Sequence, residues 1–548
     1  FLCVLCLSQK GMVIKMKKII GILSAITLSL SAFAFTGCGG QTNVVKDPKT
    51  LNIKVYKAGY GDSYVKGWID QFEEMYSAEG YKINIVESND QIQASTVMNE
   101  MILGKKNSID FYITGNCAPS ALYNTSVQEE TSQMIAAELD DVFASKPIKA
   151  DKTEENVTIE QKLKAGYSDY FKWDGKYYAF PYRSCPVGLV VNSEAFKKYA
   201  TEYPKTTDEL LKIADTIKAS SKSTEIYPYA FAGYNAHSYL YGIEDVWVAQ
   251  YSGTDYYSNL CSLNSVNSAD EAAALVGDKG WEESLEIIKA IQDPYNCARN
   301  SINDQHTKAQ AALLNGKAVF MVTGQWLQNE MYQDYPDKAG NMEMIKTPVI
   351  SALGVKLGLD GNNGSDEAKC DEILSLLVKC VDEGKTASEA IAAAGEKGVT
   401  VTESQYNEVK KARGIIYEWG IPFQIVVNSY SDKIDVAKLF LRYIASDDAA
   451  KIAFNASTTV SPYESSALDF TSSAKYTKYI KSVDEIQKDS DAYIYRIQTG
   501  KRAKYQIGFF NEYQSIEKTF MVSRDLKVSE VLSKEKSQMK NIWSQRIG

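Results

Sequence analysis

The sequence predicts an α/β fold that begins with a mainly parallel sheet. Apolar and polar residues alternate over 51–56, as in a strand, and apolar positions over 64–80 recur with the period of a helix. A second helical pattern at 91–106 lies between strand patterns at 81–87 and 108–115. The order strand, helix, strand, helix, strand predicts parallel strands joined by right-handed crossovers.

Residues that follow the carboxyl ends of these strands are the first candidates for a binding site, because ligands of open parallel sheets bind beside those ends. Tyr60 follows the first strand and Asn116 follows the third. We expect both side chains to lie on one rim of the sheet. Trp68 lies on the apolar face of the first helix, so we expect it to be a core residue.

The later sequence continues the alternation of strands and helices. Residues 172–199 predict a hairpin, a loop, a buried strand and the start of a helix. Residues 203–220 predict a helix with Thr206 or Thr207 as its N-cap, because two acidic residues then fall in the first turn, where the helix dipole favours negative charge. Residues 356–420 predict a mainly helical insertion.

The start of the chain has the pattern of a secretory signal. We interpret 1–15 as wrongly included upstream sequence before an initiator at Met16, and 16–37 as a signal peptide with a basic start and a short apolar run. A transmembrane anchor is the alternative, but the apolar run is at the short limit for a membrane span.

Cys38 ends the tetrapeptide Phe-Thr-Gly-Cys, which resembles the bacterial lipobox. Phe35 departs from that pattern, which usually has leucine at this position. We expect a lipid on Cys38, cleavage before it, and a flexible polar tether over 38–49. The protein would then be anchored by lipid to the outer face of the cell membrane.

Composition excludes several function classes. Beyond residue 37 the chain holds 56 basic and 69 acidic side chains, which argues against nucleic acid or anionic lipid as a partner. Two histidines in the whole chain argue against zinc catalysis and His-based triads, so we expect no metal and no cofactor. Six scattered cysteines in the folded part predict buried thiols, with one or two bridges left open. The 36 tyrosines suit recognition of amphipathic ligands.

Seven stretches of the sequence together resemble the extracellular solute-binding proteins of bacterial ABC importers, in the carbohydrate-binding family that includes maltose-binding protein. They stand in the order typical of that family. The stretches are FEEMY (72–76), IDFYITG (109–115), AELDDVF (137–143), DGKYYAFPYRSCPVGLVVNSEAF (174–196), YPKTTDELLKIA (203–214), NGKAVFMVTGQW (315–326) and SDKIDVAKLFLRYIASDDAAKIAFNASTTVSPY (431–463).

The resemblance implies a two-lobed fold of the type II periplasmic-binding-protein kind, with hinge strands between the lobes. The first lobe would comprise 50–182 and 429–475, and the second 183–428 and 476–548, with the insertion at 356–420. Such a protein is expected to be a monomer without enzymatic activity. It would capture a carbohydrate, and in particular an oligosaccharide, in the cleft between its lobes and deliver it to the permease subunits of an ABC importer.

The resemblance also implies ligand-binding residues. Gln325 and Trp326 follow a second-lobe strand from which the family presents a tryptophan to the cleft. Arg183 stands at the first hinge, with either the ligand or an interlobe salt bridge as its partner. The remaining implied contacts are Tyr182 at the first hinge, Tyr234 and Trp247 in an aromatic stretch of the second lobe, and Trp419 before the second hinge.

Two other functions stay open at this point. A secreted glycoside hydrolase would need two carboxylates that face a cleft, and no obvious catalytic glutamate stands at a strand terminus. A receptor for a peptide, a polyamine or a phosphorylated compound is the other alternative. The sequence has no phosphate-binding loop of the Walker type, and its aromatic excess favours sugars.

Overall fold

A computed structural model describes residues 44–547 except 90, 91, 93, 108, 116, 125–132, 235–238, 299–300, 422 and 509–519. The chain divides into two units, Phe1–Val44 and Val45–Gly548, and the elements below all belong to the second. The expected signal peptide and Cys38 lie outside the described residues, as does Asn116. Among the helices of the described ranges, none has the length and apolarity needed to cross a membrane.

A five-stranded sheet forms the first of two groups of elements, which we call the first lobe. Its strand order is β2 (Lys82–Asn89), β1 (Thr50–Tyr56), β3 (Phe111–Ile113), β14 (Gln424–Val427) and β8 (Phe180–Pro181). β1 runs parallel to β2 and β3, which confirms the predicted parallel strands. β14 runs antiparallel to β3 and β8.

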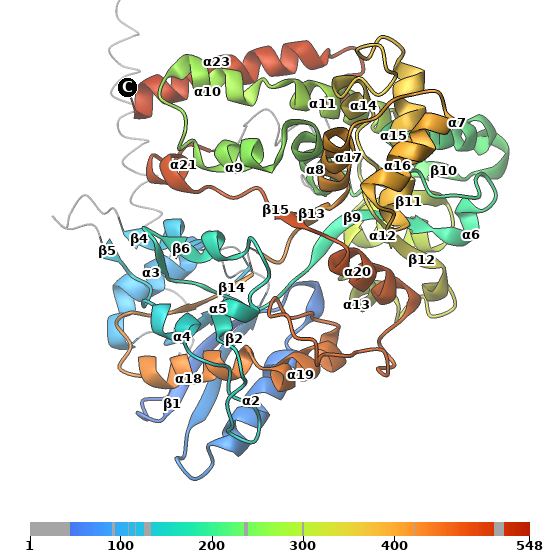
Figure 1. The fold of residues 1–548 in the computed structure, drawn as a ribbon. Coiled ribbons are helices and arrows are strands. Elements are labelled where there is room, and N and C mark those ends of the chain that lie inside the picture. Colours follow the sequence, from blue (N-terminus) through green and yellow to red (C-terminus); the bar gives the residue numbers. More distant parts are fainter. Residues whose placement is uncertain are drawn as a thin grey trace, which may run out of the picture. The chain divides into compact units, whose positions relative to one another are not determined.

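Helix α2 (Ser63–Met75) packs against α19 (Asp447–Ser457), although the two lie far apart in the sequence (Figure 1). Trp68 is 2% exposed, and its indole N–H donates to the carbonyl of Ala449 at 2.8 Å, so its expected core position is confirmed. The other elements of the first lobe are η1 (Ala58–Tyr60), α3 (Ala94–Gly104), η2 (Lys105–Asn107), η3 (Pro119–Leu122), β4 (Tyr123–Asn124), β5 (Gln133–Met134), α4 (Asp140–Ala144), α5 (Ile159–Lys162), η4 (Ser168–Phe171), β6 (Lys172–Trp173), β7 (Lys176–Tyr177) and α18 (Ile434–Ile444).

A second sheet forms the core of the other group, the second lobe. Its order is β10 (Tyr227–Tyr229), β11 (Ala318–Gly324), β9 (Pro186–Asn192), β13 (Ile415–Glu418) and β15 (Ala492–Ile494), and β12 (Met342–Ile345) also pairs with β9. β10, β11, β12, β13 and β15 share one direction, as expected of a mainly parallel sheet. β9 runs antiparallel to its neighbours β11, β12 and β13, so the sheet is mixed. β9 has the opposite direction because it begins on the side of the sheet where the chain arrives from the first lobe, whereas β11 and β13 end on that side.

The helices of the second lobe account for most of its sequence. α7 starts after Thr206, whose hydroxyl accepts the N–H of Glu209, so Thr206 is the N-cap. The helices are α6 (Ser193–Phe196), α7 (Thr207–Thr224), α8 (Tyr241–Ser252), α9 (Thr254–Ser262), α10 (Ala269–Val276), α11 (Lys279–Ile291), α12 (His306–Leu314), α13 (Leu327–Met331), η5 (Ala339–Asn341), α14 (Ala352–Lys356), α15 (Glu367–Asp382), α16 (Ala387–Glu396), α17 (Glu403–Arg413), α20 (Lys478–Lys488), α21 (Gly500–Lys504) and α23 (Val528–Arg546).

Two expected boundaries change in the structure. The helical insertion expected at 356–420 ends at Arg413, because 415–418 form β13 inside the second sheet. The first lobe regains the chain before residue 429, because β14 already belongs to the first sheet. Both differences arise from short strands that sequence periodicity does not separate from their neighbours.

The chain passes between the lobes in three segments, which we call the first, second and third crossing segments. They comprise 182–185 between β8 and β9, 419–423 between β13 and β14, and 458–477 between α19 and α20. The first and third are joined, because the N–H of Ser184 donates to the carbonyl of Val460 at 2.8 Å.

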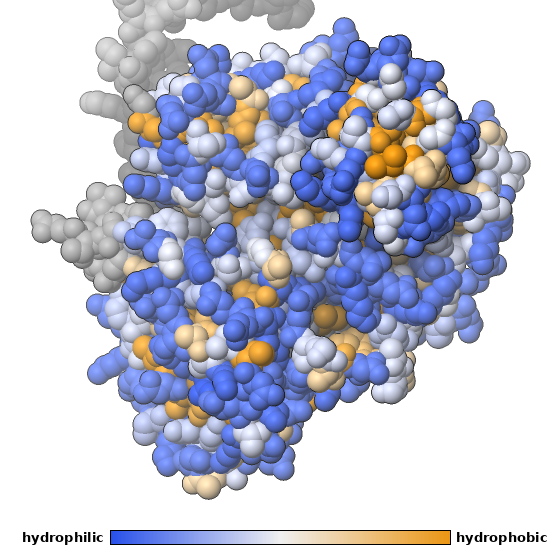
Figure 2. All heavy atoms as spheres, in the orientation of Figure 1, coloured by the Kyte–Doolittle hydropathy of each residue, from blue (hydrophilic) through white to orange (hydrophobic). Residues whose placement is uncertain are grey.

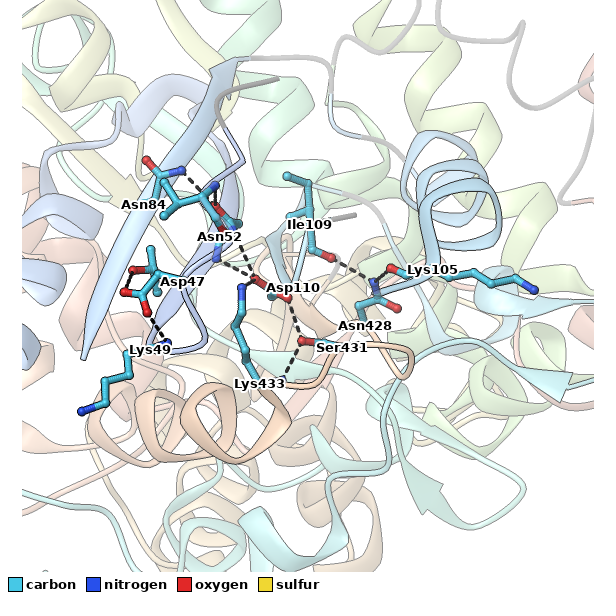
Figure 3. A network of polar contacts seen from close by, with 12 residues as sticks. Asp47, Lys49, Asn52, Asn84, Lys105, Ile109, Asp110, Asn428, Ser431 and Lys433 are labelled. Atoms are coloured by element: carbon cyan, nitrogen blue, oxygen red, sulfur yellow. Dashed lines mark hydrogen bonds and ion pairs between the residues drawn. The ribbon is translucent and has the colours of Figure 1, made fainter. Parts of the chain in front are cut away.

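A buried polar network ties the first lobe together at the amino end of β3 (Figure 3). The carboxylate of Asp110 accepts the backbone N–H of Asn52 at 2.8 Å, the hydroxyl of Ser431 at 2.7 Å and the ammonium of Lys433 at 3.1 Å. Asp110 is 1% exposed and Lys433 9%. This network joins β1, β3 and the segment after β14 at the sheet edge opposite the carboxyl end of β3.

Candidate functional site

The carboxyl ends of strands in both lobes meet at the crossing segments. β11, β13 and β15 share one direction, since β13 is parallel to β15 and both β11 and β13 oppose β9. Trp326, Trp419 and Tyr495 follow the ends of these strands. Tyr60 follows β1 of the first sheet in the same way. The strand-end rule that selected Tyr60 thus selects aromatic residues of the second lobe as well.

Five aromatic side chains form a group on the second-lobe edge, which we call the aromatic group. The ring of Trp419 lies 6.4 Å from that of Trp326, 6.0 Å from that of Tyr239 and 5.7 Å from that of Tyr495. Tyr241 stacks on Trp419 with ring planes 5° apart. Trp326 is buried and Trp419 half-buried. The structure therefore brings together two of the three tryptophans that the sequence selected as ligand contacts.

Arg183 lies in a cage of aromatic rings. Its guanidinium carbon is 3.8 Å from the ring centre of Tyr60 and 4.6 Å from that of Phe423, and Nη2 donates to the hydroxyl of Tyr64 at 3.1 Å. Nε and Nη1 are buried without a hydrogen-bond acceptor among the described residues. No carboxylate in this part of the structure is within ion-pair distance, so the expected interlobe salt bridge is not formed.

Arg183 stays protonated although its side chain is buried. Loss of hydration disfavours the cation, but the surrounding hydroxyls of Tyr64, Tyr182 and Tyr60 outweigh that effect and hold the pKa of Arg183 above its ordinary value. A buried cation with two unused N–H donors can bind an acceptor that enters the site.

Tyr60 and Glu330 make contacts between the lobes. The hydroxyl of Tyr60 lies 2.9 Å from Sγ of Cys185, which joins η1 to the first crossing segment. Gly59 lies so close to the carboxylate of Glu330 in α13 that a side chain at this position would collide with it. Burial raises the pKa of Glu330, and the amide of Gln310 donates to it at 2.7 Å.

The remaining sequence predictions have different outcomes. Tyr182 is buried beside Arg183, and its hydroxyl donates to the carbonyl of Thr114 at 3.1 Å. Gln325 is buried and donates to the carbonyl of Thr458, while its own amide oxygen has no donor among the described residues. Tyr234 is 63% exposed.

Trp247 requires a correction. It lies in the core of the second lobe with no exposed surface, and its indole donates to the carbonyl of Pro348 at 2.9 Å. The first ten residues of α8 are all buried, which explains why the sequence here is rich in apolar residues without a helical period. The aromatic density that suggested a ligand contact reflects a helix surrounded on every side.

A cavity of about 980 Å³ opens between the lobes beside β15 and the segment that follows β3. Its first-lobe wall is formed by residues that follow β3 and by the β6–β7 hairpin, and its second-lobe wall by α9, α21 and the end of β15. Figure 2 shows this recess between the part that holds β4 and β6 in Figure 1 and the part that holds α9 and α21. Of the residues selected from the sequence, those that the structure describes do not line it.

The first-lobe wall carries aromatic faces. Trp173 and Tyr123 have ring centres 5.2 Å apart and both are half-buried. Asp174 and Gly175 follow with positive φ angles of 50° and 81°, the geometry of a two-residue hairpin turn that presents Trp173 at its base. The Trp-Asp-Gly sequence is the signal that could have found this residue, because Asp-Gly favours a tight hairpin turn directly after it.

The second-lobe wall is mainly polar. Asp255, Ser258, Asn264, Gln498 and Lys501 line it opposite the aromatic faces. Aromatic planes can cover the C–H face of a pyranose, and such polar side chains can bond its hydroxyls. No group of three or more metal-binding side chains occurs among the residues that the structure describes. The six cysteines of the folded part are buried and unpaired, as the sequence favoured.

Comparisons with solved structures support the fold. A chitin oligosaccharide binding protein superposes with a TM-score of 0.58 and 13% identity, covering 90% of this chain and 99% of that one. An ABC substrate-binding protein from Listeria monocytogenes in complex with cycloalternan superposes with a TM-score of 0.56 and 14% identity, covering 91% and 100%. At this identity the likeness concerns the fold, and it confirms the expected α/β architecture with two sheets.

Curated relatives match a smaller part of the chain. A multiple sugar-binding protein of Streptococcus mutans is 25% identical over 178 residues, which cover 32% of this chain and 39% of that protein. The melibiose/raffinose/stachyose-binding protein MelE of Bacillus subtilis is 26% identical over 180 residues, which also cover 32% of this chain and 39% of that protein.

A family model covers most of the chain. The model described as bacterial extracellular solute-binding protein matches residues 67–483. This match contains the sequence motifs on which the resemblance rested, and it agrees with the expectation of a binding protein without enzymatic activity. The chain belongs to the bacterial extracellular solute-binding protein family.

Proposed function

We propose that this protein captures an oligosaccharide between its lobes and delivers it to an ABC importer. The observation that carries the proposal is the cavity of about 980 Å³ with aromatic faces on one wall and polar side chains on the other. A volume near the upper end of the usual range for ligand pockets suits an oligosaccharide better than a single sugar ring.

The ligand would contact two regions. Trp173 and Tyr123 would cover sugar faces inside the cavity, and the aromatic group around Trp326 and Trp419 would extend the same surface toward the crossing segments. Arg183 would donate from its unused N–H groups to a hydroxyl of the ligand, because a buried donor without an acceptor costs roughly 1–3 kcal/mol. The sugar-binding functions named for both curated relatives support the class of ligand.

The anchoring of the protein remains part of the proposal. Lipid on Cys38 would hold the binding domain at the outer face of the cell membrane, beside the permease subunits to which it passes its ligand. Replacement of Cys38 by alanine would abolish labelling with radioactive palmitate. Labelling that persists in Cys38→Ala would refute the lipid anchor while leaving the sugar proposal intact.

Calorimetry of the chain from residue 44 tests the sugar proposal. The panel would contain raffinose, chitin oligosaccharides, xylan oligosaccharides and cyclic glucans, with a peptide, spermidine and a sugar phosphate as the other arms. Micromolar or tighter binding of at least one oligosaccharide is expected, without formation of product. Heat with only a non-sugar arm would contradict the carbohydrate claim, and release of shorter sugars would point to an enzyme.

A further inference from the structure

A single buried carboxylate joins two of the crossing segments. Glu418, at the end of β13, has no exposed surface. Its Oε1 accepts the backbone N–H of Cys185 in the first crossing segment and that of Gly420 in the second, the latter at 2.7 Å. Its Oε2 accepts the hydroxyl of Ser184 at 2.9 Å. Glu418 therefore fixes the chain at Cys185, where the chain enters the second lobe, and at Gly420, where the chain leaves that lobe.

Ser184 extends this contact to the third crossing segment and to both lobes. Its N–H donates to Val460, as described above. Its hydroxyl oxygen accepts the ammonium of Lys164 at 2.9 Å and the amide of Gln487 at 2.6 Å. Lys164 belongs to the first lobe, just after α5, and Gln487 to α20 of the second. We call these four side chains (Glu418, Ser184, Lys164 and Gln487) the crossing node.

The hydrogen-bonding capacity of Ser184 is used fully by these contacts. A hydroxyl has one proton to donate and two lone pairs, and here the proton goes to Glu418 while the lone pairs accept Lys164 and Gln487. The hydroxyl of Tyr167 is a third, more distant donor to this oxygen, at 3.4 Å. Lys164 also lies 5.4 Å from the ring centre of Tyr493 in β15. A change in the angle between the lobes would move Lys164 relative to Gln487 and Tyr493, so the node cannot stay intact through it.

We propose that the crossing node positions the two lobes relative to each other and thereby sets the affinity for ligand without touching it. Glu418 and Ser184 are positioning residues in this account. The network around Asp110 offers a contrast, because its Ser431–carboxylate bond is also buried but lies wholly within the first lobe. Loss of the Ser184 hydroxyl removes its bonds to Glu418, Lys164 and Gln487, and loss of the Ser431 hydroxyl removes its bonds to Asp110 and the N–H of Lys433, but only the node variant releases a link between lobes.

The distance between the lobes tests this directly. Spin labels at Asp70→Cys in α2 and Lys410→Cys in α17, both exposed positions, report one lobe each. They are introduced in the chain from residue 44, whose six native cysteines are buried. Pulsed electron spin resonance would be measured without ligand for the otherwise unchanged chain, for Ser184→Ala and for the control Ser431→Ala. We expect a broader and shifted distance distribution for Ser184→Ala alone. Unchanged distributions, or equal changes in both variants, would overturn the proposal.

Ligand affinity gives the second readout, and this readout rests on the proposed function. With the oligosaccharide that binds in calorimetry, Ser184→Ala is expected to weaken binding on the order of tenfold, and Ser431→Ala less than about twofold. Lys164→Met keeps the apolar stem but removes the donor, and should reproduce the distance change if Ser184→Ala fails to fold. If no sugar binds the native chain, the proposed function fails, whereas the spin-label result still decides the node.

Discussion

Asp110 and Arg183 are both buried charged side chains, but their surroundings differ. Asp110 accepts hydrogen bonds from a backbone amide, a hydroxyl and an ammonium group within one lobe. Arg183 meets the rings of Tyr60 and Phe423, and two of its nitrogens have no acceptor in the described part of the chain. A charge whose partners are all supplied by the fold stabilises the fold, whereas one with unused donors is available to a ligand.

The comparison predicts its largest effect at Asp110. Asp110→Ala leaves the buried ammonium of Lys433 without its counter-charge, so the free energy of unfolding should fall by about 3–5 kcal/mol. Urea unfolding followed by circular dichroism measures this. The folded fraction should bind ligand as the native chain does, because the network lies at the far edge of the sheet. If the free energy of unfolding fell by less than about 1 kcal/mol, or if ligand binding were lost without a loss of stability, Asp110 and Arg183 would not differ in the way described.

Arg183→Met should weaken ligand binding but leave the stability of the fold nearly unchanged. The apolar side chain can fill the aromatic cage without the cost of burying a cation, so the free energy of unfolding should change by less than about 1 kcal/mol. Ligand affinity should fall by roughly 1–3 kcal/mol, since a donor to the ligand is lost. Calorimetry and urea unfolding of the same preparation separate the two effects. Intact affinity together with strong destabilisation would make Arg183 a structural residue like Asp110.

Trp173→Ala tests whether the comparison extends to the cavity. Removal of this half-buried ring should weaken binding by about tenfold, or ~1.4 kcal/mol, with little effect on stability. Tyr295→Ala is the matched control, because Tyr295 is an aromatic residue 60% exposed outside the cavity. Equal affinity for both variants and the native chain would remove the cavity from the binding site.

Glu330 is intermediate between Asp110 and Arg183, because among the described residues it accepts one hydrogen bond, from the amide of Gln310. Burial raises its pKa above the ordinary value of 4.5. Above pH 4.5 the unfolded chain has lost this proton while the folded chain still holds it. Stability therefore falls as the pH rises from 4.5 through the raised pKa of Glu330. In Glu330→Gln this component is absent, so urea unfolding between pH 4 and 7 should show a flatter profile. An identical profile in both proteins would mean that Glu330 is hydrated.

The sequence predicted the first lobe better than the second. In the first lobe, the parallel strands around β1 and the core position of Trp68 follow from local periodicity, and both are confirmed. In the second lobe, helix chemistry predicted the start of α7, and Thr206 is the N-cap of the two residues it allowed. The direction of β9 could not be predicted, because it depends on which edge of the second sheet the chain enters. The two-lobed family fold came from the order of motifs and not from any single pattern.

The candidate site was predicted only in part. Trp326 and Trp419 were implied by the family resemblance, and the structure brings them together because both follow strands of one direction. Trp247 could not be assigned, since an aromatic-rich helix has the same composition in a core as beside a ligand. The cavity is lined by separate segments within 118–123, 165–175, 254–264 and 491–504, and no pattern of local period records contacts between them.

A crystal structure with the tightest-binding oligosaccharide from the calorimetry panel tests the central claim most directly. The account predicts a sugar in the cavity between the lobes, with one ring face against Trp173 and further rings directed toward Trp326 and Trp419. A sugar bound outside the cavity and away from both aromatic surfaces would contradict it.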